Sequence, residues 1–184
     1  MIARTHDVGA VALLLTTAVW LELEQLPTAT IIVCLIAKQL GALLPDIDQA
    51  SNQLWELLPA DRIFSKFLNK LFGSHRTLSH SILGVLITYQ ISLWLLPKLF
   101  NKEFINPIIV FWALIIGYIS HLFLDMLTEE GIPLLFPIKW KFGLPPIKSL
   151  RIKSGKWVEK FIIFPLILVY IVWLLAKNWY DLNL

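Results

Sequence analysis

Five apolar segments constrain the fold of this chain more than any other feature of its sequence. They cover residues 8–21, 28–44, 78–97, 105–127 and 161–177. A membrane-spanning helix needs about 20 predominantly apolar residues, so the fourth segment is long enough and the first two are short. The chain is 57% hydrophobic and only 16% charged, with a mean hydropathy of +0.70, which excludes an ordinary soluble domain. The sequence therefore predicts an all-α integral membrane bundle of about five transmembrane helices, forming a single domain over residues 1–184.

The basic residues fall mainly on one side of these predicted spans. That side holds Arg4 and the lysines and arginines of two long connections, 45–77 and 128–160. The other side has only Lys98, Lys102 and Lys177. Because cytoplasmic loops of membrane proteins are rich in Lys and Arg, we expect the N-terminus and both long connections in the cytoplasm and the C-terminus outside. Topology thus accounts for the net charge of +3, and we expect no nucleic-acid partner.

Two connecting segments are expected to lie at the membrane surface. Within 54–72, apolar residues recur at helical spacing, while Arg62, Lys66 and Lys70 occupy another face. This pattern is typical of an interfacial amphipathic helix, with a soluble capping helix as the alternative. Gly131 to Leu150 is apolar but interrupted by prolines, so we expect an irregular interfacial loop that covers the site.

All four histidines lie at the ends of the apolar segments, and carboxylates accompany them. Ionisable side chains in or beside a membrane span are costly and usually mark function. The expected topology places all of them at the cytoplasmic face. The single cysteine, Cys34, excludes a thiolate cluster, so any metal must be held by nitrogen and oxygen. The predicted metal ligands are His6, Asp46, Asp48, His75, His80, His121, Asp125 and Glu159.

Two of these motifs have a spacing that suits metal ligands, and each has an alternative interpretation. His121 and Asp125 are related as i and i+4, so they share one face of a helix; a hydrogen-bonded pair that tightens helix packing is the alternative. Asp46 and Asp48 would point the same way in an extended or turn segment, because Pro45 ends the helix before them. Solvated cap carboxylates are the alternative there.

The third motif surrounds a loop-to-helix junction. His75 and His80 lie on either side of it, and Thr77 or Ser79 would cap the third predicted span. The positive end of that helix would favour an anion. Arg76 would hold a phosphate oxygen with two hydrogen bonds, or would pair with one of the carboxylates.

The remaining polar residues near this face are less specific. His6 gains weight only because it opens a span on the favoured side. Glu159 is either a further ligand or a solvated residue at a helix start. Glu129 and Glu130 form a polar turn, although either could act as a base.

Four imidazoles with three or four carboxylates exceed the needs of one tetrahedral ion. Two ions bridged by carboxylate and hydroxide would use them. Such a pair lowers the pKa of bound water and stabilises charge on a phosphoryl or acyl centre. Mixed nitrogen and oxygen ligation suits Zn²⁺ best, with Mn²⁺ or Fe²⁺ as alternatives.

As an ordered set, these motifs resemble the bacterial membrane-bound metal-dependent hydrolase family over nearly the whole chain. They are Thr5-His6, Leu44-Pro45-Asp46-Ile47-Asp48, His75-Arg76-Thr77-Leu78-Ser79-His80-Ser81, Ser120-His121 through Asp125 with Thr128 and Gly131-Ile132-Pro133-Leu134, and Ser154-Gly155 to Glu159. The resemblance implies an inner-membrane protein that carries the ligand set given above. Its site would be distantly similar to those of zinc-dependent phospholipase C and related single-strand nucleases, which implies phosphoester hydrolysis. The acidic Glu129-Glu130 would disfavour a strongly anionic substrate unless the basic loops outweigh it.

We therefore expect a membrane-bound hydrolase that cleaves a phosphoester of a phospholipid or lipid-linked headgroup at the cytoplasmic interface. Arg76 would stabilise the charged transition state, and Asp46 or Asp48, when not a ligand, would accept the proton. Hydrolysis of an amide or carboxylic ester is the enzymatic alternative. A metal-binding membrane scaffold or transporter without hydrolytic activity is the rival. Transport is disfavoured because the outer halves of the spans have few polar residues.

Overall fold

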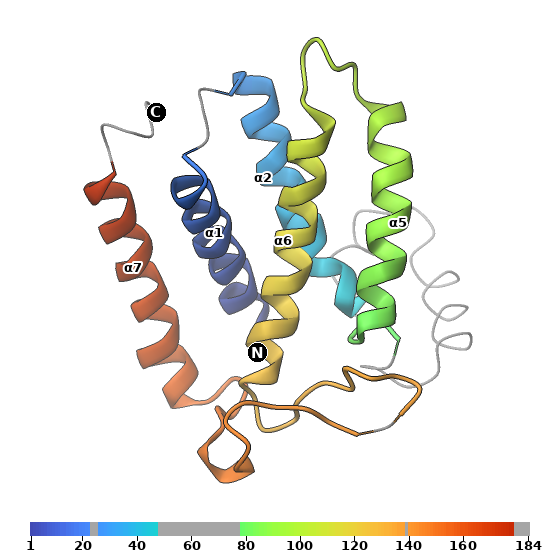
Figure 1. Ribbon diagram of the computed structural model, residues 1–184. Helices are drawn as coiled ribbons and strands as arrows, with labels where there is room; N and C mark the ends of the chain where they lie inside the picture. The colour runs from blue at the N-terminus through green and yellow to red at the C-terminus, as the bar shows by residue number, and fades with distance from the viewer. Residues whose placement is uncertain (23–25, 48–77, 139, 179–184) are drawn as a thin grey trace, which may run out of the picture.

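The chain folds into aligned helices that stand side by side (Figure 1). A computed structural model describes residues 1–22, 26–47, 78–138 and 140–178, and the all-α prediction is confirmed for this part of the chain. The helices are α1 Ala3–Trp20, α2 Thr28–Leu43, α5 Ile82–Leu99, α6 Pro107–Met126 and α7 Phe164–Lys177. Three short turns are the 3₁₀ segments η1 Leu44–Asp46 and η2 Lys148–Leu150 and the π-helical η3 Glu159–Ile163.

Four of the described helical segments are long and apolar enough to cross a membrane. They are Thr28–Asp46, Ile82–Leu99, Pro107–Met126 and Glu159–Lys177. The first predicted span differs, because α1 begins at Ala3 rather than near Val8. Its first turns therefore include Arg4, His6 and Asp7, which lower its hydropathy. Of the about five predicted spans, four are therefore apolar helices long enough to cross a membrane, and the fifth helix, α1, packs against α2, α6 and α7.

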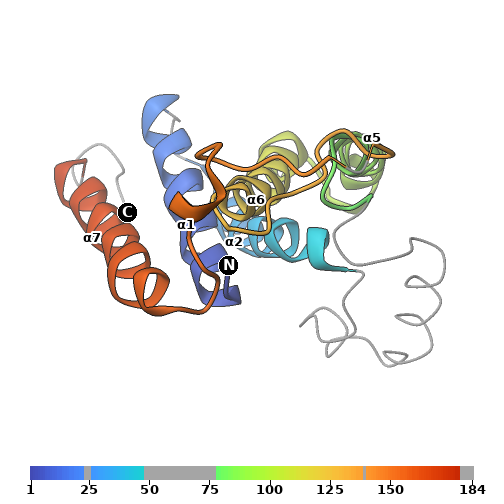
Figure 2. The ribbon, with the colours of Figure 1, turned by 90° about the horizontal axis from the view of Figure 1, so that it is seen from below.

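Helix α6 is the centre of the bundle. Of its spanning window 67% is buried, against 17% for the α5 window and 11% for the Glu159–Lys177 window that contains α7. Viewed from below, α6 lies among α1, α2 and α5, while α7 packs on the far side of α1 (Figure 2). A helix with apolar side chains on all sides and few buried ones is suited to face lipid. Helices α5 and α7 therefore form the flanks, and α6 carries the core.

The closest contact in the bundle joins α2 to α6. A Cβ atom at Gly41 would overlap the backbone carbonyl of Leu114, and one at Gly117 would overlap that of Lys38. Each glycine follows an alanine by four residues, so both helices present a small-xxx-small face of the kind that lets membrane helices approach closely. This contact fixes the position of the lower end of α2 against α6.

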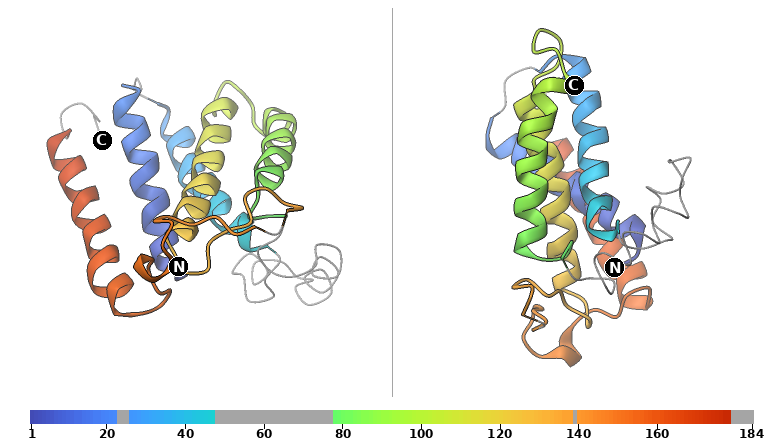
Figure 3. Two further views of the ribbon diagram at one scale, coloured as in Figure 1. Left: turned by 60° about the horizontal axis from the view of Figure 1, so that its bottom comes forward. Right: turned by 90° about the vertical axis from the view of Figure 1, so that its right-hand side faces the viewer.

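The segment between α6 and η3 is irregular, as expected, and crosses the lower end of the bundle (Figure 3). Two isolated β-bridges organise it, Thr128 with Ile152 and Ile132 with Phe142. The backbone amide of Leu144 donates to the carbonyl of Met126 at 2.8 Å, which ties the loop to the end of α6. The predicted amphipathic helix at 54–72 lies outside the described residues.

Two local boundaries differ from the sequence predictions. His6 lies within the first turns of α1 rather than before it. Helix α5 starts at Ile82 and its cap is Ser81, whose hydroxyl accepts from the amide of Gly84 at 3.3 Å, so Ser79 is not the cap. Asp46, by contrast, lies in a 3₁₀ turn after the end of α2, which is one of the two conformations expected there.

Candidate metal centre

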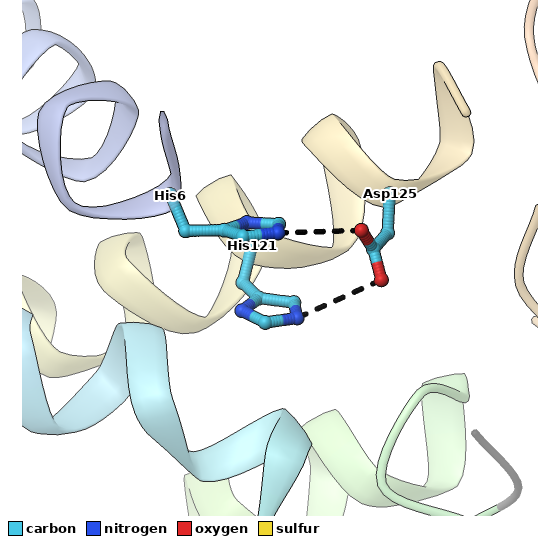
Figure 4. A group of neighbouring side chains, drawn as sticks. All are labelled: His6, His121 and Asp125. Carbon is cyan, nitrogen blue, oxygen red and sulfur yellow. Dashed lines mark ion pairs between the residues drawn. The ribbon is translucent and has the colours of Figure 1, made fainter. Parts of the chain in front are cut away.

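Five of the predicted ligands meet at one end of the bundle. His6 comes from α1, Asp46 from η1, His80 from the turn before α5, and His121 and Asp125 from the last turns of α6. Figure 4 shows His6, His121 and Asp125 pointing toward one another. The three histidines and Asp125 are at most 4% exposed, whereas the Asp46 side chain is 28% exposed. The cluster is therefore a buried polar group with one more accessible carboxylate.

Asp125 occupies the middle of this cluster. Its Oδ1 lies 3.3 Å from Nε2 of His6 and 2.6 Å from the amino nitrogen of Met1. Its Oδ2 lies 3.5 Å from Nε2 of His80 and 3.7 Å from Nε2 of His121. The two carboxylate oxygens thus face different histidines, which is the arrangement a bridging ligand requires.

Asp46 completes a second set of contacts. Its Oδ1 lies 3.5 Å from Nε2 of His80 and 3.7 Å from Nε2 of His121. These two nitrogens therefore sit between the same two carboxylate oxygens, one from Asp46 and one from Asp125. Ligands held at about 2.0–2.2 Å around a tetrahedral Zn²⁺ are about 3.3–3.6 Å apart, so the observed separations fit the ligands of one ion.

His121 is oriented for metal binding by a backbone carbonyl. Its Nδ1 lies 2.7 Å from the carbonyl oxygen of Ala42, which can only accept, so Nδ1 carries the proton. That tautomer leaves the lone pair of Nε2 directed at the cluster. Among the described residues, this buried Nε2 has no hydrogen-bond partner. A metal-ligating histidine commonly has its other nitrogen held in this way.

Two triads of side chains could each hold an ion. One comprises His6, His121 and Asp125, and the other Asp46, His80 and His121; within each, the candidate ligand atoms lie within 4.8 Å of one another. His121 belongs to both triads, and its ring stacks on that of His6 at a centroid distance of 3.9 Å. The Nε2 atom of His121 can ligate only one ion at a time, so it can serve only one of the two triads. If two ions were bound, Asp125 would have to be the residue that bridges them, with one oxygen toward each.

Glu159 lies outside both triads. It is fully buried, so it is not a solvated residue. Its Oε1 accepts from the backbone amide of Ile2 at 2.8 Å, and its Oε2 accepts from that of Gly155 at 2.6 Å. Both oxygens are thus used to tie the N-terminal segment to the start of η3. The structure gives Glu159 an anchoring position next to the cluster.

Three predicted residues, Asp48, His75 and Arg76, lie outside the described residues, and their roles stay predictions. Of the two acidic residues after α6, Glu129 lies in a turn and pairs with Lys153 at 3.8 Å on the surface. This contact supports the interpretation of a polar turn for Glu129.

Sequence reasoning missed the residues that position the ligands. Ala42 offers only a carbonyl, which no side-chain pattern reveals. The Tyr118 hydroxyl donates to the backbone carbonyl of Ser79 and so holds the turn that carries His80. A signal was present for the helix contact, because the spacings Ala37 to Gly41 and Ala113 to Gly117 are small-xxx-small motifs.

Comparison with known proteins places this chain among bacterial membrane proteins. Residues 1–180 match the family model described as YdjM inner membrane protein. Inner membrane protein YdjM of Escherichia coli (strain K12) is 36% identical over 135 residues, which cover 73% of this chain. The match spans 63% of the length of that relative.

Uncharacterized protein YvsG of Bacillus subtilis (strain 168) is 32% identical over 163 residues, covering 89% of this chain and 88% of the relative. No solved structure matches the chain. The family match covers nearly all of the sequence and agrees with the long apolar helices. The chain therefore belongs to the YdjM inner membrane protein family and is an inner membrane protein.

Proposed function

We propose that this protein is a metal-dependent hydrolase that cleaves a phosphoester of a membrane lipid or lipid-linked headgroup. One observation carries the proposal, namely the convergence of three buried imidazoles and two carboxylates from four separate segments, with separations that fit metal ligands. Gathering several ionisable groups at the end of membrane helices is costly and usually marks a functional site.

The donor set suits two zinc ions. His80, His121 and Asp46 would hold one ion together with Oδ2 of Asp125, and His6 would hold the other with Oδ1 of Asp125. Nitrogen and oxygen donors of this kind also accept Mn²⁺ or Fe²⁺. Bound zinc supplies Lewis acidity, which lowers the pKa of water and stabilises negative charge on a phosphoryl group.

With Oδ1 of Asp46 placed among the ligands, its second oxygen, Oδ2, is the candidate for accepting a proton. The Asp46 side chain is 28% exposed, whereas that of Asp125 is 1% exposed, so of these two carboxylates Asp46 is the one with access from outside. A carboxylate within reach of water at the mouth of a site can accept a proton as a general base. Asp48 and Arg76, predicted as base and transition-state stabiliser, would join it there.

The location of the cluster favours a lipid over a soluble substrate. It lies at the ends of helices suited to span the membrane, which is the depth of lipid headgroups. A cavity of about 410 Å³ lies between residues 14–21, at the end of α1, and residues 109–116 of α6, and its lining is apolar. Along the helix axis, its near end at Leu14 is about 12 Å from His6 and its far end at Leu21 about 22 Å. One leaflet of the hydrocarbon core is about 15 Å thick, so the near end of the cavity is within reach of an acyl chain whose headgroup lies at the cluster.

Metal content and lipid hydrolysis by the purified protein test this proposal. We expect the parent protein, in detergent, to contain zinc and to release a phosphorylated headgroup from phospholipid or lipid-linked substrates. His121→Ala and Asp46→Ala should each lose at least about 100-fold in activity, because each removes a ligand. Glu103→Ala is the matched control, since this exposed carboxylate lies in the connection at the opposite end of the bundle.

The same measurement separates the alternatives. A parent protein that binds zinc, loses it in His121→Ala, and hydrolyses no lipid or soluble phosphodiester would support a metal-binding scaffold instead. Zinc uptake into proteoliposomes that depends on the same ligands would support a transporter. Release of a fatty acid or amine in place of a phosphorylated product would indicate ester or amide hydrolysis.

A further inference from the structure

A lysine lies buried in the middle of a membrane helix. Lys38 is on α2 and is only 6% exposed. It lies about 12 Å from Asp46 along the helix axis, well inside the hydrocarbon core. A charged side chain at that depth is costly and generally has a partner and a purpose. The two triads do not include it.

Lys38 is one end of a short polar chain that joins α2 to α1. Its Nζ donates to Oε1 of Gln39 at 2.8 Å, and Nε2 of Gln39 donates to Oδ1 of Asp7 at 2.6 Å. Because an ammonium can only donate, the amide oxygen of Gln39 must face Lys38, and the amide nitrogen must face Asp7. The amide then has its donor directed at the carboxylate. Both bonds involve a charged group, which makes them stronger than neutral ones in a low dielectric.

The polar network of Lys38, Gln39 and Asp7 adjoins the candidate metal centre at both of its ends. Asp7 follows His6 directly on α1. The backbone of Lys38 packs against Gly117 of α6, and Ala42, one turn further along α2, accepts the hydrogen bond from His121. One turn of α2 therefore contacts α6, which carries His121 and Asp125, and also α1, which carries His6.

We propose that Lys38, Gln39 and Asp7 are positioning residues that set the register of α1 against α2 and so keep His6 next to Asp125. The inference rests on the metal centre of the proposed function. None of the three belongs to the two candidate ligand triads; they would act through the helix that presents His6. The contacts of His6 and Met1 with Asp125 join the N-terminal segment to α6, and the polar network links α1 to α2 independently of them.

Charge removal in single and paired variants tests this role. Lys38→Met leaves the Asp7 carboxylate without its buried counter-charge, and Asp7→Asn leaves the Lys38 ammonium without its own. Lys38 is buried, Asp7 is half-buried, and the two charges are joined through Gln39. Removing one of two linked charges leaves the other uncompensated, while removing both is closer to neutral. We expect each single variant to bind zinc about tenfold more weakly, as for other residues that orient ligands, and the double variant to recover to within about threefold of the parent.

Zinc affinity is measured by chelator competition in detergent, beside thermal unfolding of the metal-free protein. Thr16→Val is the matched control: its hydroxyl bonds Tyr170 of α7 at 2.8 Å, also from α1, but about 15 Å along the helix from His6. We expect its zinc affinity to equal that of the parent. Single variants that melt earlier yet keep the parent affinity would reduce the network to a structural role and overturn the inference.

A double variant as weak as the product of the two single effects would also overturn it. The outcome for the parent separates this inference from the proposed function. A parent that binds no zinc, manganese or iron contradicts the metal centre itself and everything built on it. A parent that binds zinc while the single variants match it contradicts only the role of the polar chain. If the parent hydrolyses no substrate but the single variants bind zinc more weakly than the parent, the inference stands and the proposed enzymatic activity is contradicted.

Discussion

At the scale of single residues, the geometry of the cluster depends on backbone groups as much as on side chains. The ring of His121 is held by the carbonyl of Ala42. The turn that carries His80 is held by the hydroxyl of Tyr118, which donates to the carbonyl of Ser79. An imidazole that is held by its second nitrogen loses little freedom when it binds a metal. Positioning residues of this kind should therefore be as sensitive to mutation as some of the ligands.

Tyr118→Phe tests this dependence. The variant keeps the ring packing of a side chain that is 2% exposed and removes only the hydroxyl that donates to Ser79. We expect the turn carrying His80 to loosen and the zinc affinity to fall by up to about tenfold. Chelator competition measures the effect.

Tyr170→Phe is the control for this experiment, because its hydroxyl also makes one bond, to Thr16, away from the cluster. An equal loss of zinc affinity in both variants would mean that the hydroxyl of Tyr118 has no special relation to His80.

At the scale of helices, the crossing of α2 and α6 determines whether the ligands meet. The carbonyl of Ala42 reaches His121 because Gly41 and Gly117 allow the two backbones to touch. Membrane helices gain little from the hydrophobic effect against each other, so close packing of small residues is a main source of their association.

Gly117→Ala should separate these helices. The added Cβ meets the rigid backbone carbonyl of Lys38, so the helices must move apart. We expect the free energy of unfolding in detergent to fall by at least about 1–3 kcal/mol and zinc binding to weaken in parallel. Thermal unfolding with and without zinc measures both effects.

Gly9→Ala is the matched control. Its added methyl would meet the terminal carbon of the flexible Leu124 side chain, which can rotate away. We expect a smaller loss of stability than in Gly117→Ala. If Gly9→Ala proved the more damaging of the two, the close contact between α2 and α6 would not be the feature that holds the bundle together.

At the scale of the whole molecule, the bundle has two unlike ends. The cluster, the irregular loop and the N-terminus lie at one end, and the connection that carries Lys102 lies at the other (Figure 1). The loop end also carries most of the basic residues, which is the signature of a cytoplasmic face.

Cysteine labelling tests this orientation. In a Cys34→Ala background, Lys102→Cys should react with a membrane-impermeant maleimide in spheroplasts. Lys153→Cys should react only after the membrane is opened, because we expect the loop end to face the cytoplasm. Both lysines are exposed, so access to the reagent is not limited by burial. Reaction of Lys153→Cys in closed spheroplasts would place the cluster on the outer face.

The sequence by itself determined the helical class, four of the apolar spans and the end of the bundle at which His6, Asp46, His80, His121 and Asp125 would lie. It could do so because hydropathy, helix length and charge bias are properties of consecutive residues. The starts of α1 and α5 were less predictable. The start of α5 depends on the capping bond of Ser81, for which Thr77 and Ser79 were similar candidates nearby, and α1 has no side-chain cap that would mark its start.

Only the tertiary structure decided which side chains face one another. It showed that Asp125 lies between three histidines, that each oxygen of Glu159 accepts a backbone amide, and that Lys38 reaches Asp7 through Gln39. These outcomes depend on the distance and register between helices; for α2 and α6 both are set by the close approach at Gly41 and Gly117. Register between helices is a property of packed surfaces, so no single segment of the sequence contains it.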